Sequence, residues 1–313
     1  MTSYQKKHQV ILSRCPDYER ARLGDTLNSV MSSLVLPQNT SGLRVLLKPN
    51  FVSSRGQEIA CTNVEFLRAA AIWFRDHGAK VTIGDSPAFG STRSVMDNYG
   101  MTDLLADIGC EPVNFSRPVV RVVGDGISLG IAREAFECDL LVNLPKLKAH
   151  NQMFVTGAVK NLFGTVVGIQ KAGLHMRHGS SHDEFANILL ELSEILPDNI
   201  SLVDGIRVMH RSGPMDGDPL SLGCVGGAHS AVALDTALLS VLELPFDESP
   251  LWRVAAAAKH SGADPKSIDY VMEHPESFHG SGFRAPEGLN PIRFNPFRLM
   301  MSTIRKVKIA LRG

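Results

Sequence analysis

Two patterns of apolar residues alternate along this chain. Short runs rich in β-branched residues are typical of buried strands, and they cover residues 9–13, 43–48, 80–84, 139–144, 200–204 and 220–225. Stretches in which apolar residues recur every three or four positions predict helices, and they cover residues 17–34, 62–78, 156–163, 230–242 and a stretch that begins at residue 181. This alternation predicts an α/β fold with a parallel, doubly wound sheet.

Two of these helices begin with the sequence of a capping box, in which a hydroxyl and a later carboxylate satisfy the first free amides. The pairs are Thr62 with Glu65 and Ser181 with Glu184. We therefore expect each pair to fix the start of its helix.

The domain organisation follows from a change in composition after Gly280. Residues 1–280 are predicted to form the α/β core, as two lobes that divide near residues 145–150 and leave a cleft between them. Residues 281–313 are predicted to wrap around this core as a tail, which ends in a basic amphipathic helix at 297–311. Such a helix can lie on an anionic membrane surface, or it can pack on its own domain or on a second subunit of a homodimer.

Charge and cysteine content narrow the function classes. The 313-residue chain has 32 Lys and Arg residues together and 32 Asp and Glu residues together, so its formal net charge is zero. No overall electrostatic field therefore attracts it to nucleic acid. No stretch approaches the roughly 20 apolar residues of a membrane span, and no signal peptide is evident. The five cysteines are dispersed, without any CxxC pair, which indicates a reducing, cytoplasmic location and argues against a cysteine-ligated iron–sulfur site.

Polar residues follow four of the predicted strands. In parallel sheets, ligands bind beyond the carboxyl ends of the strands, so these residues are expected to line one cleft. The residues in question are Lys48, Asn50, Asp85, Lys146, Lys148, His150 and Asp204.

The segment 143–164 carries the strongest chemical signal, because it holds three lysines and a histidine but no acid. Lys146 and Lys148 alternate with an apolar residue and should point to the same side of an extended chain. Lys160 and Asn161 follow on the predicted helix. This cluster suits a carboxylate or phosphate ligand, while the alternative is a solvated basic loop. Neighbouring cations should lower the pKa of His150, so that its neutral ring can accept a proton or bind a metal.

Three further features are candidates for ligand binding. His175, His178 and His182 have spacings that can ligate a divalent transition metal, or they belong to a mobile surface loop. The tight loop at 210–217 is either a connecting turn or a ligand loop. Asp235 interrupts an apolar helix, and a lysine of the site is its expected partner.

The order of several motifs resembles the domain of unknown function 362 family. The motifs are LLKPN (46–50), IGDSP (83–87), LPKLKAH (144–150), VKNLFG (159–164) and VDGI (203–206), within a resemblance that runs from about residue 10 to 270. Many members of that family also carry a ferredoxin-like cluster domain. The missing CxxC spacings imply that this chain does not.

A second likeness is to nickel-dependent lactate racemase. That family also presents a histidine, then a glycine-rich turn with a lysine, then another histidine after a comparable strand. The order would assign these roles to His150, Lys160 and His175. In the racemase, a histidine exchanges the substrate's hydride with a pincer-type nickel cofactor held by the lysine and a histidine.

Together these features predict an enzyme that acts on a small carboxylate or phosphate substrate. His150 and Lys160 are its expected catalytic residues, with a metal or organometallic cofactor near Lys160 and His175 and with redox or racemase-type chemistry. The expected substrate-binding residues are Lys48, Asn50, Asp85, Lys146, Lys148, Asn161 and Asp204. The alternative is an accessory protein that holds an anionic cofactor or metabolite without turning it over.

Overall fold

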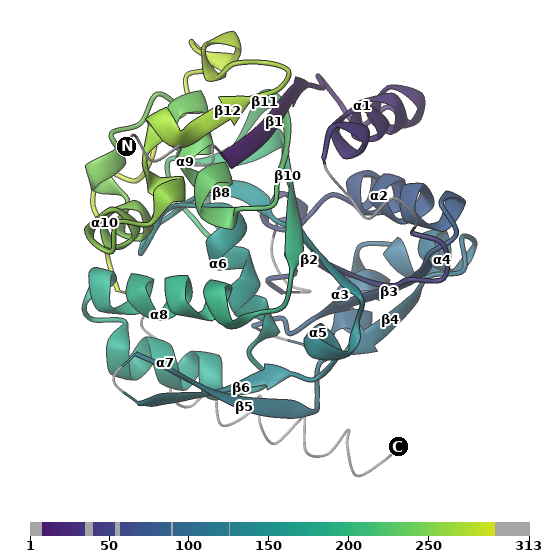
Figure 1. Ribbon diagram of the computed structural model, residues 1–313, viewed down its shortest axis with the longest axis horizontal. Helices are drawn as coiled ribbons and strands as arrows, with labels where there is room; N and C mark the ends of the chain where they lie inside the picture. Colours follow the sequence, from purple (N-terminus) through teal and green to yellow (C-terminus); the bar gives the residue numbers. More distant parts are fainter. Residues whose placement is uncertain (1–7, 35–39, 54–56, 89, 125, 292–313) are drawn as a thin grey trace, which may run out of the picture.

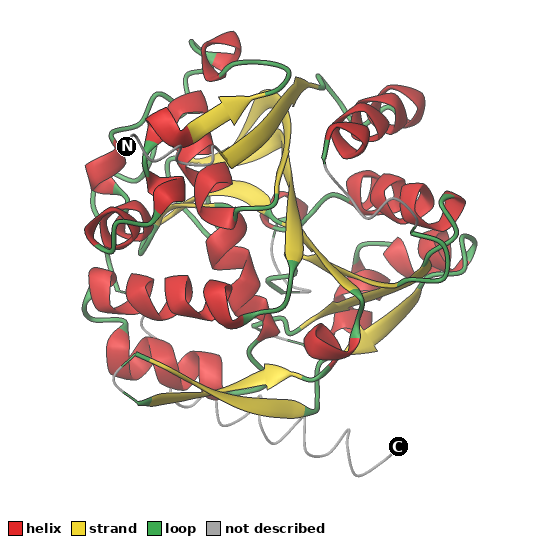
Figure 2. Ribbon diagram, in the orientation of Figure 1, coloured by secondary structure: helices red, strands yellow, loops and turns green. Residues whose placement is uncertain are grey.

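The computed structural model describes residues 8–34, 40–53, 57–88, 90–124 and 126–291. Its strands are β1 (His8–Arg14), β2 (Arg44–Pro49), β3 (Lys80–Asp85), β4 (Glu111–Asn114), β5 (Pro118–Val123), β6 (Ile127–Ala132), β7 (Leu140–Leu144), β8 (Lys146–His150), β9 (Phe154–Thr156), β10 (Asn199–His210), β11 (Asp218–Ala228) and β12 (Ile268–Tyr270). Figures 1 and 2 show one large twisted sheet, in the order β12-β1-β11-β10-β7-β2-β3-β4, and a separate β5–β6 hairpin.

The large sheet is mostly parallel. Strands β10, β7, β2 and β3 are neighbours and run in the same direction, with Val45 paired to Leu140 on one side and to Val81 on the other. β11 is antiparallel to both of its neighbours. The predicted parallel α/β sheet, including these four central strands, is confirmed.

Helices cover both faces of this sheet, as a doubly wound arrangement requires (Figure 1). They are α1 (Arg20–Ser33), α2 (Val64–Asp76), α3 (Thr92–Asn98), α4 (Met101–Ala106), α5 (Glu134–Glu137), α6 (Ala158–Leu162), α7 (Gln170–His178), α8 (His182–Ile195), α9 (Ala231–Val241) and α10 (Pro250–Ala257). Short 3-10 turns are η1 (Glu58–Ala60), η2 (Phe163–Thr165), η3 (Phe246–Glu248), η4 (Ser261–Ala263), η5 (Pro265–Ser267) and η6 (Pro275–Phe278). In the described ranges, no helix is long and apolar enough to cross a membrane.

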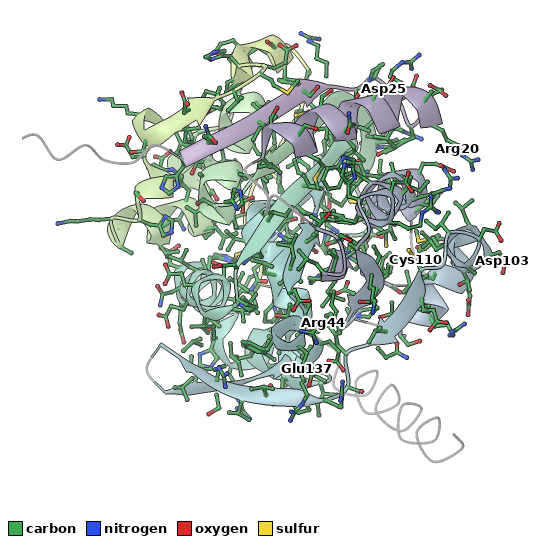
Figure 3. All side chains as sticks on the ribbon, turned by 45° about the vertical axis from the view of Figure 1, so that its right-hand side comes forward. Arg20, Asp25, Arg44, Asp103, Cys110 and Glu137 are labelled. Carbon is green, nitrogen blue, oxygen red and sulfur yellow. The ribbon has the colours of Figure 1, made fainter. Side chains whose placement is uncertain are left out.

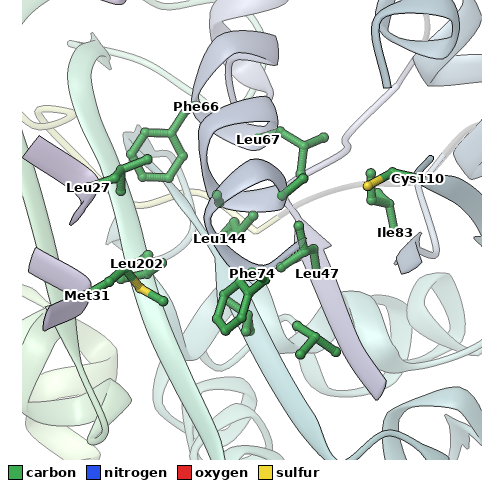
Figure 4. Close-up of a cluster of buried hydrophobic side chains, with 14 of the residues drawn as sticks. Leu27, Met31, Leu47, Phe66, Leu67, Phe74, Ile83, Cys110, Leu144 and Leu202 are labelled. Atoms are coloured by element: carbon green, nitrogen blue, oxygen red, sulfur yellow. The ribbon is translucent and has the colours of Figure 1, made fainter. Parts of the chain in front are cut away.

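Successive side chains along each strand point to opposite faces of the sheet, so the hydrophobic core is divided into a cluster on each face. Leu47 of β2 packs with Phe66 and Phe74 of α2, and Leu27 and Met31 of α1 join them (Figure 4). The neighbouring β2 residue, Leu46, belongs to the cluster on the other face, under α6 and α8. Burying both faces in this way explains why the strands read as continuous apolar runs.

Charged side chains of α1 lie on the opposite side of that helix. Arg20 and Asp25 project away from the sheet, as Figure 3 shows. The predicted amphipathic character of this helix is thus what fixes it against the sheet.

Two local predictions are corrected. Asn63, not Thr62, caps α2, because its side chain accepts a hydrogen bond from the Glu65 amide at 2.9 Å. The Thr62 hydroxyl instead donates to the Leu144 carbonyl at 2.7 Å, which ties the loop to the end of β7. The helix predicted to start at Thr156 begins only at Ala158, because residues 154–156 pair with β8.

At the second predicted capping box, Ser181 accepts from the Glu184 amide at 3.2 Å, so the cap forms as expected. The Glu184 carboxylate turns to His178 instead of back to the cap. The amphipathic segment predicted at 297–311 lies outside the described residues.

Candidate functional site

A cavity of about 410 Å³ opens beside the carboxyl ends of β2, β3 and β8. Its wall contains most of the polar residues predicted to converge, namely Lys48, Asn50, Asp85, Lys148, His150, Lys160 and Asn161. His175 also lines it. The end of the parallel sheet therefore gathers side chains that lie as far apart in sequence as Lys48 and His175.

Lys48 is neutralised within the fold. Its ammonium group lies 2.9 Å from the Asp85 carboxylate, and the two side chains are 0% and 3% exposed. Asp85 also accepts hydrogen bonds from the amides of Phe51 and Ser86, both at 2.8 Å. A side chain on Gly164 would approach this pair to within 2.4 Å, so the glycine of the VKNLFG motif makes room for it.

Lys148 is buried, and it forms no ion pair with a described residue. Its Nζ donates to the carbonyl of Ala60 at 2.6 Å, and no described carboxylate lies within ion-pair distance of it. Burial, and secondarily the charges of Lys146 and Lys48, lower its pKa to about 8. At neutral pH this lysine is still mostly a cation, so it is suited to hold an anion.

Thr156 faces Lys148 across the β8–β9 ladder and lines the same cavity. Its hydroxyl is buried and has no hydrogen-bond partner among the described residues. Buried polar groups are nearly always paired in proteins, so a hydroxyl left open beside an uncompensated ammonium indicates a place for a ligand.

Lys160 is surrounded by aromatic carbon rather than by acids. Its Nζ lies 4.7 Å from the ring centre of Phe163 and 5.9 Å from that of Phe185. Burial, followed by the charges of Lys148 and Lys48, lowers its pKa to about 7. This amine therefore exists in both protonation states near neutral pH.

His150 is held in one tautomer by the backbone. Its Nδ1 accepts hydrogen bonds from the amides of Gln152 and Met153, at 3.1 and 3.2 Å. Burial and the nearby Lys160 and Lys148 hold its pKa well below the usual value, so the ring is neutral. Since Nδ1 is the acceptor, the single ring proton resides on Nε2, which is the nitrogen left for the cavity.

Helix α6, which carries Lys160, is held at its first turn by Asp235. The carboxylate accepts from the amides of Ala158 and Val159, at 2.6 and 3.0 Å. A side chain on Gly157 would come within 2.3 Å of it. The sequence predicted a lysine partner for Asp235, but the carboxylate binds the helix backbone instead. Burial raises the pKa of Asp235 to about 7.

Asn161 links α6 to the sheet. Its Nδ2 donates to Oδ1 of Asn143 at 2.8 Å, and its Oδ1 accepts from the ammonium group of Lys48 at 3.4 Å. Asn143 in turn donates to the Ala158 carbonyl at 3.0 Å. These contacts fix the position of the neighbouring Lys160 against the strand ends.

Lys146 and Asp204 do not join this cavity, which corrects the prediction of one shared cleft. They are directly opposite in the β8–β10 ladder and form an ion pair of 2.8 Å, to which the Tyr18 hydroxyl adds a bond of 2.8 Å. Lys146 lines a separate cavity of about 280 Å³. Both lysines lie on β8, but their side chains line different cavities.

The three histidines of the predicted metal site are also separated. His175 packs on Phe185, with 4.4 Å between ring centres, and burial lowers its pKa to about 2. His178, one turn further along α7, pairs with Glu184 at 2.5 Å. His182 begins α8. Over the described ranges, no group of three or more His, Cys, Asp or Glu side chains is placed to hold a metal ion.

The cavity also contains polar residues that the sequence did not single out. Lys171, whose ammonium group donates to the Ser86 carbonyl, and Asn151 both line the wall. Residues 213–216 of the tight loop line it as well, so the ligand-loop alternative agrees with where that loop lies. The Pro-Met-Asp-Gly sequence of this loop indicated a tight turn, but the sequence alone could not distinguish a ligand-binding loop from an ordinary connecting turn.

Comparisons with known proteins agree with the motif order. The family model described as domain of unknown function 362 matches residues 45–240. A curated relative from Synechocystis sp., named thylakoid-associated protein, is 34% identical over 302 residues, which cover 95% of this chain and 93% of that protein.

Two solved structures show a weaker likeness. A Thermotoga maritima protein has 10% identity and a TM-score of 0.43, with 63% of this chain and 53% of that chain covered. The lactate racemase apoprotein from Thermoanaerobacterium thermosaccharolyticum has 14% identity and a TM-score of 0.47, with 78% and 60% covered.

Proposed function

The chain belongs to the domain of unknown function 362 family, and we propose that it is an enzyme that binds a small carboxylate or phosphate in the 410 Å³ cavity. One observation carries the proposal. Lys148 and Lys160 face this cavity with no carboxylate partner in the described part of the chain, although both are held in an environment that disfavours their charge. A bound anion would supply the missing counter-charge.

Lys148 is the proposed anchor for the anion. The carbonyl of Ala60 fixes its ammonium group, and the open hydroxyl of Thr156 lies beside it. A charged donor and a hydroxyl on adjacent strands suit a carboxylate or phosphate, because both offer several acceptor oxygens.

His150 is proposed to donate a hydrogen bond, not to accept a proton. With Nδ1 occupied by two amides, its Nε2–H can polarise a carbonyl or carboxylate oxygen of the ligand. A neutral imidazole donor stabilises charge that develops on such an oxygen without adding a full positive charge beforehand.

Lys160 is proposed to transfer the proton. A pKa of about 7 lets the amine give up or take a proton near neutral pH, as general acid–base catalysis requires. The reaction class is then proton transfer at a carbon next to the anionic group, and racemisation of a small acid belongs to this class.

The described residues place no group of three or more His, Cys, Asp or Glu side chains to hold a bare metal ion. The proposed roles of Lys148, His150 and Lys160 use no metal ion. The cytoplasmic location stays a prediction.

Calorimetric titration of the full chain with phosphate and with short-chain carboxylates tests the proposal. We expect wild type to bind at least one of them and Lys148→Ala to weaken that binding about tenfold or more, as the loss of a charged hydrogen bond implies. Lys266→Ala, at an exposed lysine, is the matched control and should bind like wild type. Equal binding by wild type and Lys148→Ala would refute the anchor.

Turnover separates the enzyme from the accessory-protein alternative. A bound 2-substituted acid should exchange its carbon-bound hydrogen with deuterated water in the presence of wild type, and Lys160→Met should stop this exchange. Binding without any exchange would favour a protein that holds the anion and leaves it unchanged.

A further inference from the structure

The surroundings of Lys160 are those of a nucleophilic amine. Its Nζ sits over the face of Phe163, with Phe185 behind, and it shares the cavity with other ammonium groups, among them those of Lys148 and Lys48. The Lys48 charge is already matched by Asp85 at 2.9 Å. Desolvation and neighbouring cations are the two means by which proteins keep a lysine amine in its neutral, reactive form.

The cavity also offers what a carbonyl substrate needs. Lys148 and the open hydroxyl of Thr156 provide a place for a carboxylate. The Nε2–H of His150 provides a hydrogen bond for a carbonyl oxygen. The volume of about 410 Å³ fits a small molecule that spans these groups.

We propose that Lys160 forms an imine with a small 2-oxo acid whose carboxylate is held by Lys148. This inference rests on the proposed function, because it uses the same cavity and the same anchor, and it adds the substrate class and a covalent intermediate.

The step balances without any further reactant. The Nζ lone pair attacks the carbonyl carbon, a C–N bond forms, and the carbonyl oxygen accepts the hydrogen bond of His150. The oxygen then leaves as water with the two hydrogens of the amine, which gives a C=N bond. Once protonated, the imine of a 2-oxo acid such as pyruvate withdraws electrons from carbon 3 and makes a C–H bond on that carbon acidic. In this covalent intermediate Lys160 activates the substrate and does not accept its proton.

Reductive trapping tests the inference on the full-length protein. Wild type is incubated with pyruvate or glyoxylate and sodium borohydride, and the intact mass and the modified peptide are measured. We expect one stable adduct per chain, located at Lys160 by peptide mapping. Lys160→Met should give no adduct, and Lys148→Ala should trap about tenfold less at limiting pyruvate. Acetone, which has a carbonyl but no carboxylate, should trap poorly.

The peptide map of wild type decides the question even if a variant fails to fold. An adduct spread over exposed lysines, or no adduct although calorimetry shows pyruvate binding, would overturn the imine and leave the proposed anion site standing. Binding of other anions but not of pyruvate or glyoxylate would overturn the substrate class. If no anion binds at all, the proposed function itself fails.

Discussion

Lys146 and Lys148 lie two residues apart on β8, and both are almost fully buried, yet their surroundings differ. Lys146 has a carboxylate at 2.8 Å and a tyrosine hydroxyl at 2.8 Å. The ammonium group of Lys148 donates one hydrogen bond, to the backbone carbonyl of Ala60. Burial alone therefore does not mark a lysine as functional. The lack of an ion-pair partner among the described residues is the better indication, because a fold that only needed stability would gain by pairing the charge or removing it.

The same contrast recurs between Lys48, which is paired with Asp85, and Lys160, which lies on aromatic rings. Two of the four lysines are thus compensated within the fold, and two have no described carboxylate partner. The compensated ones hold strand ends together, and the other two face the cavity where we place the ligand.

Removing Lys146 should have the largest effect on stability. Lys146→Ala leaves the fully buried Asp204 without its cation, and breaking a buried pair in this way costs about 3–5 kcal/mol. Urea unfolding of the two alanine variants measures the difference, since Lys148→Ala removes no described ion pair and should change the free energy of unfolding by less than about 1 kcal/mol. Similar losses in the two variants would break the comparison.

Anion binding should depend on pH through Lys148. With a pKa of about 8, this lysine is charged below pH 8 and neutral above it, so binding should be strong at pH 7 and about tenfold weaker by pH 9. Calorimetry across this range measures the change. Lys148→Arg keeps its charge at pH 9 and should remove the weakening if the guanidinium fits. Binding that is independent of pH up to 10 would point to another anchor.

The sequence contained enough to predict the sheet but not the division of its lysines. Continuous apolar strands and periodic helices are local patterns, and they placed the four central strands correctly. Whether Lys146 or Lys148 meets a carboxylate depends on the register that sets Asp204 opposite Lys146, some 58 residues away in sequence. No local pattern encodes that register.

Individual side-chain contacts explain the other corrections. Asp235 caps α6 from a helix 76 residues away along the chain, so the expectation of a lysine partner could not anticipate it. His150 was expected to act as a base, but the turn that follows it directs two amides at Nδ1 and so assigns its proton. The three predicted histidines do not come together, because α7 ends at His178 and the His178 side chain pairs with Glu184.

Replacing Lys160 should stabilise the protein while it removes the chemistry. Its pKa is lowered from 10.5 to about 7, so the folded state disfavours the charged form; this cost is absent above pH 10.5 and grows as the pH falls to about 7. Lys160→Met should therefore raise the free energy of unfolding by about 1–2 kcal/mol at pH 6.5, and by less at pH 9. Denaturant curves at the two pH values measure this, and a destabilised variant would show that the amine has a structural partner.

The smallest effect should come from Asp235, which positions Lys160 without acting as its counter-ion. The raised pKa of about 7 means that the carboxyl largely carries a proton at pH 6, so Asp235→Asn should change stability there by no more than about 1 kcal/mol. The stability of wild type should fall as the pH rises from about 4 to 7, because ionisation is disfavoured in the folded state, and the variant should lack this fall. Burial and the charges of Lys148 and Lys48 lower the pKa of Lys160, so the pH of half-maximal borohydride trapping should stay the same in the variant. A shift of a full unit would make Asp235 a distant counter-charge, and Lys160 would then belong with the compensated lysines after all.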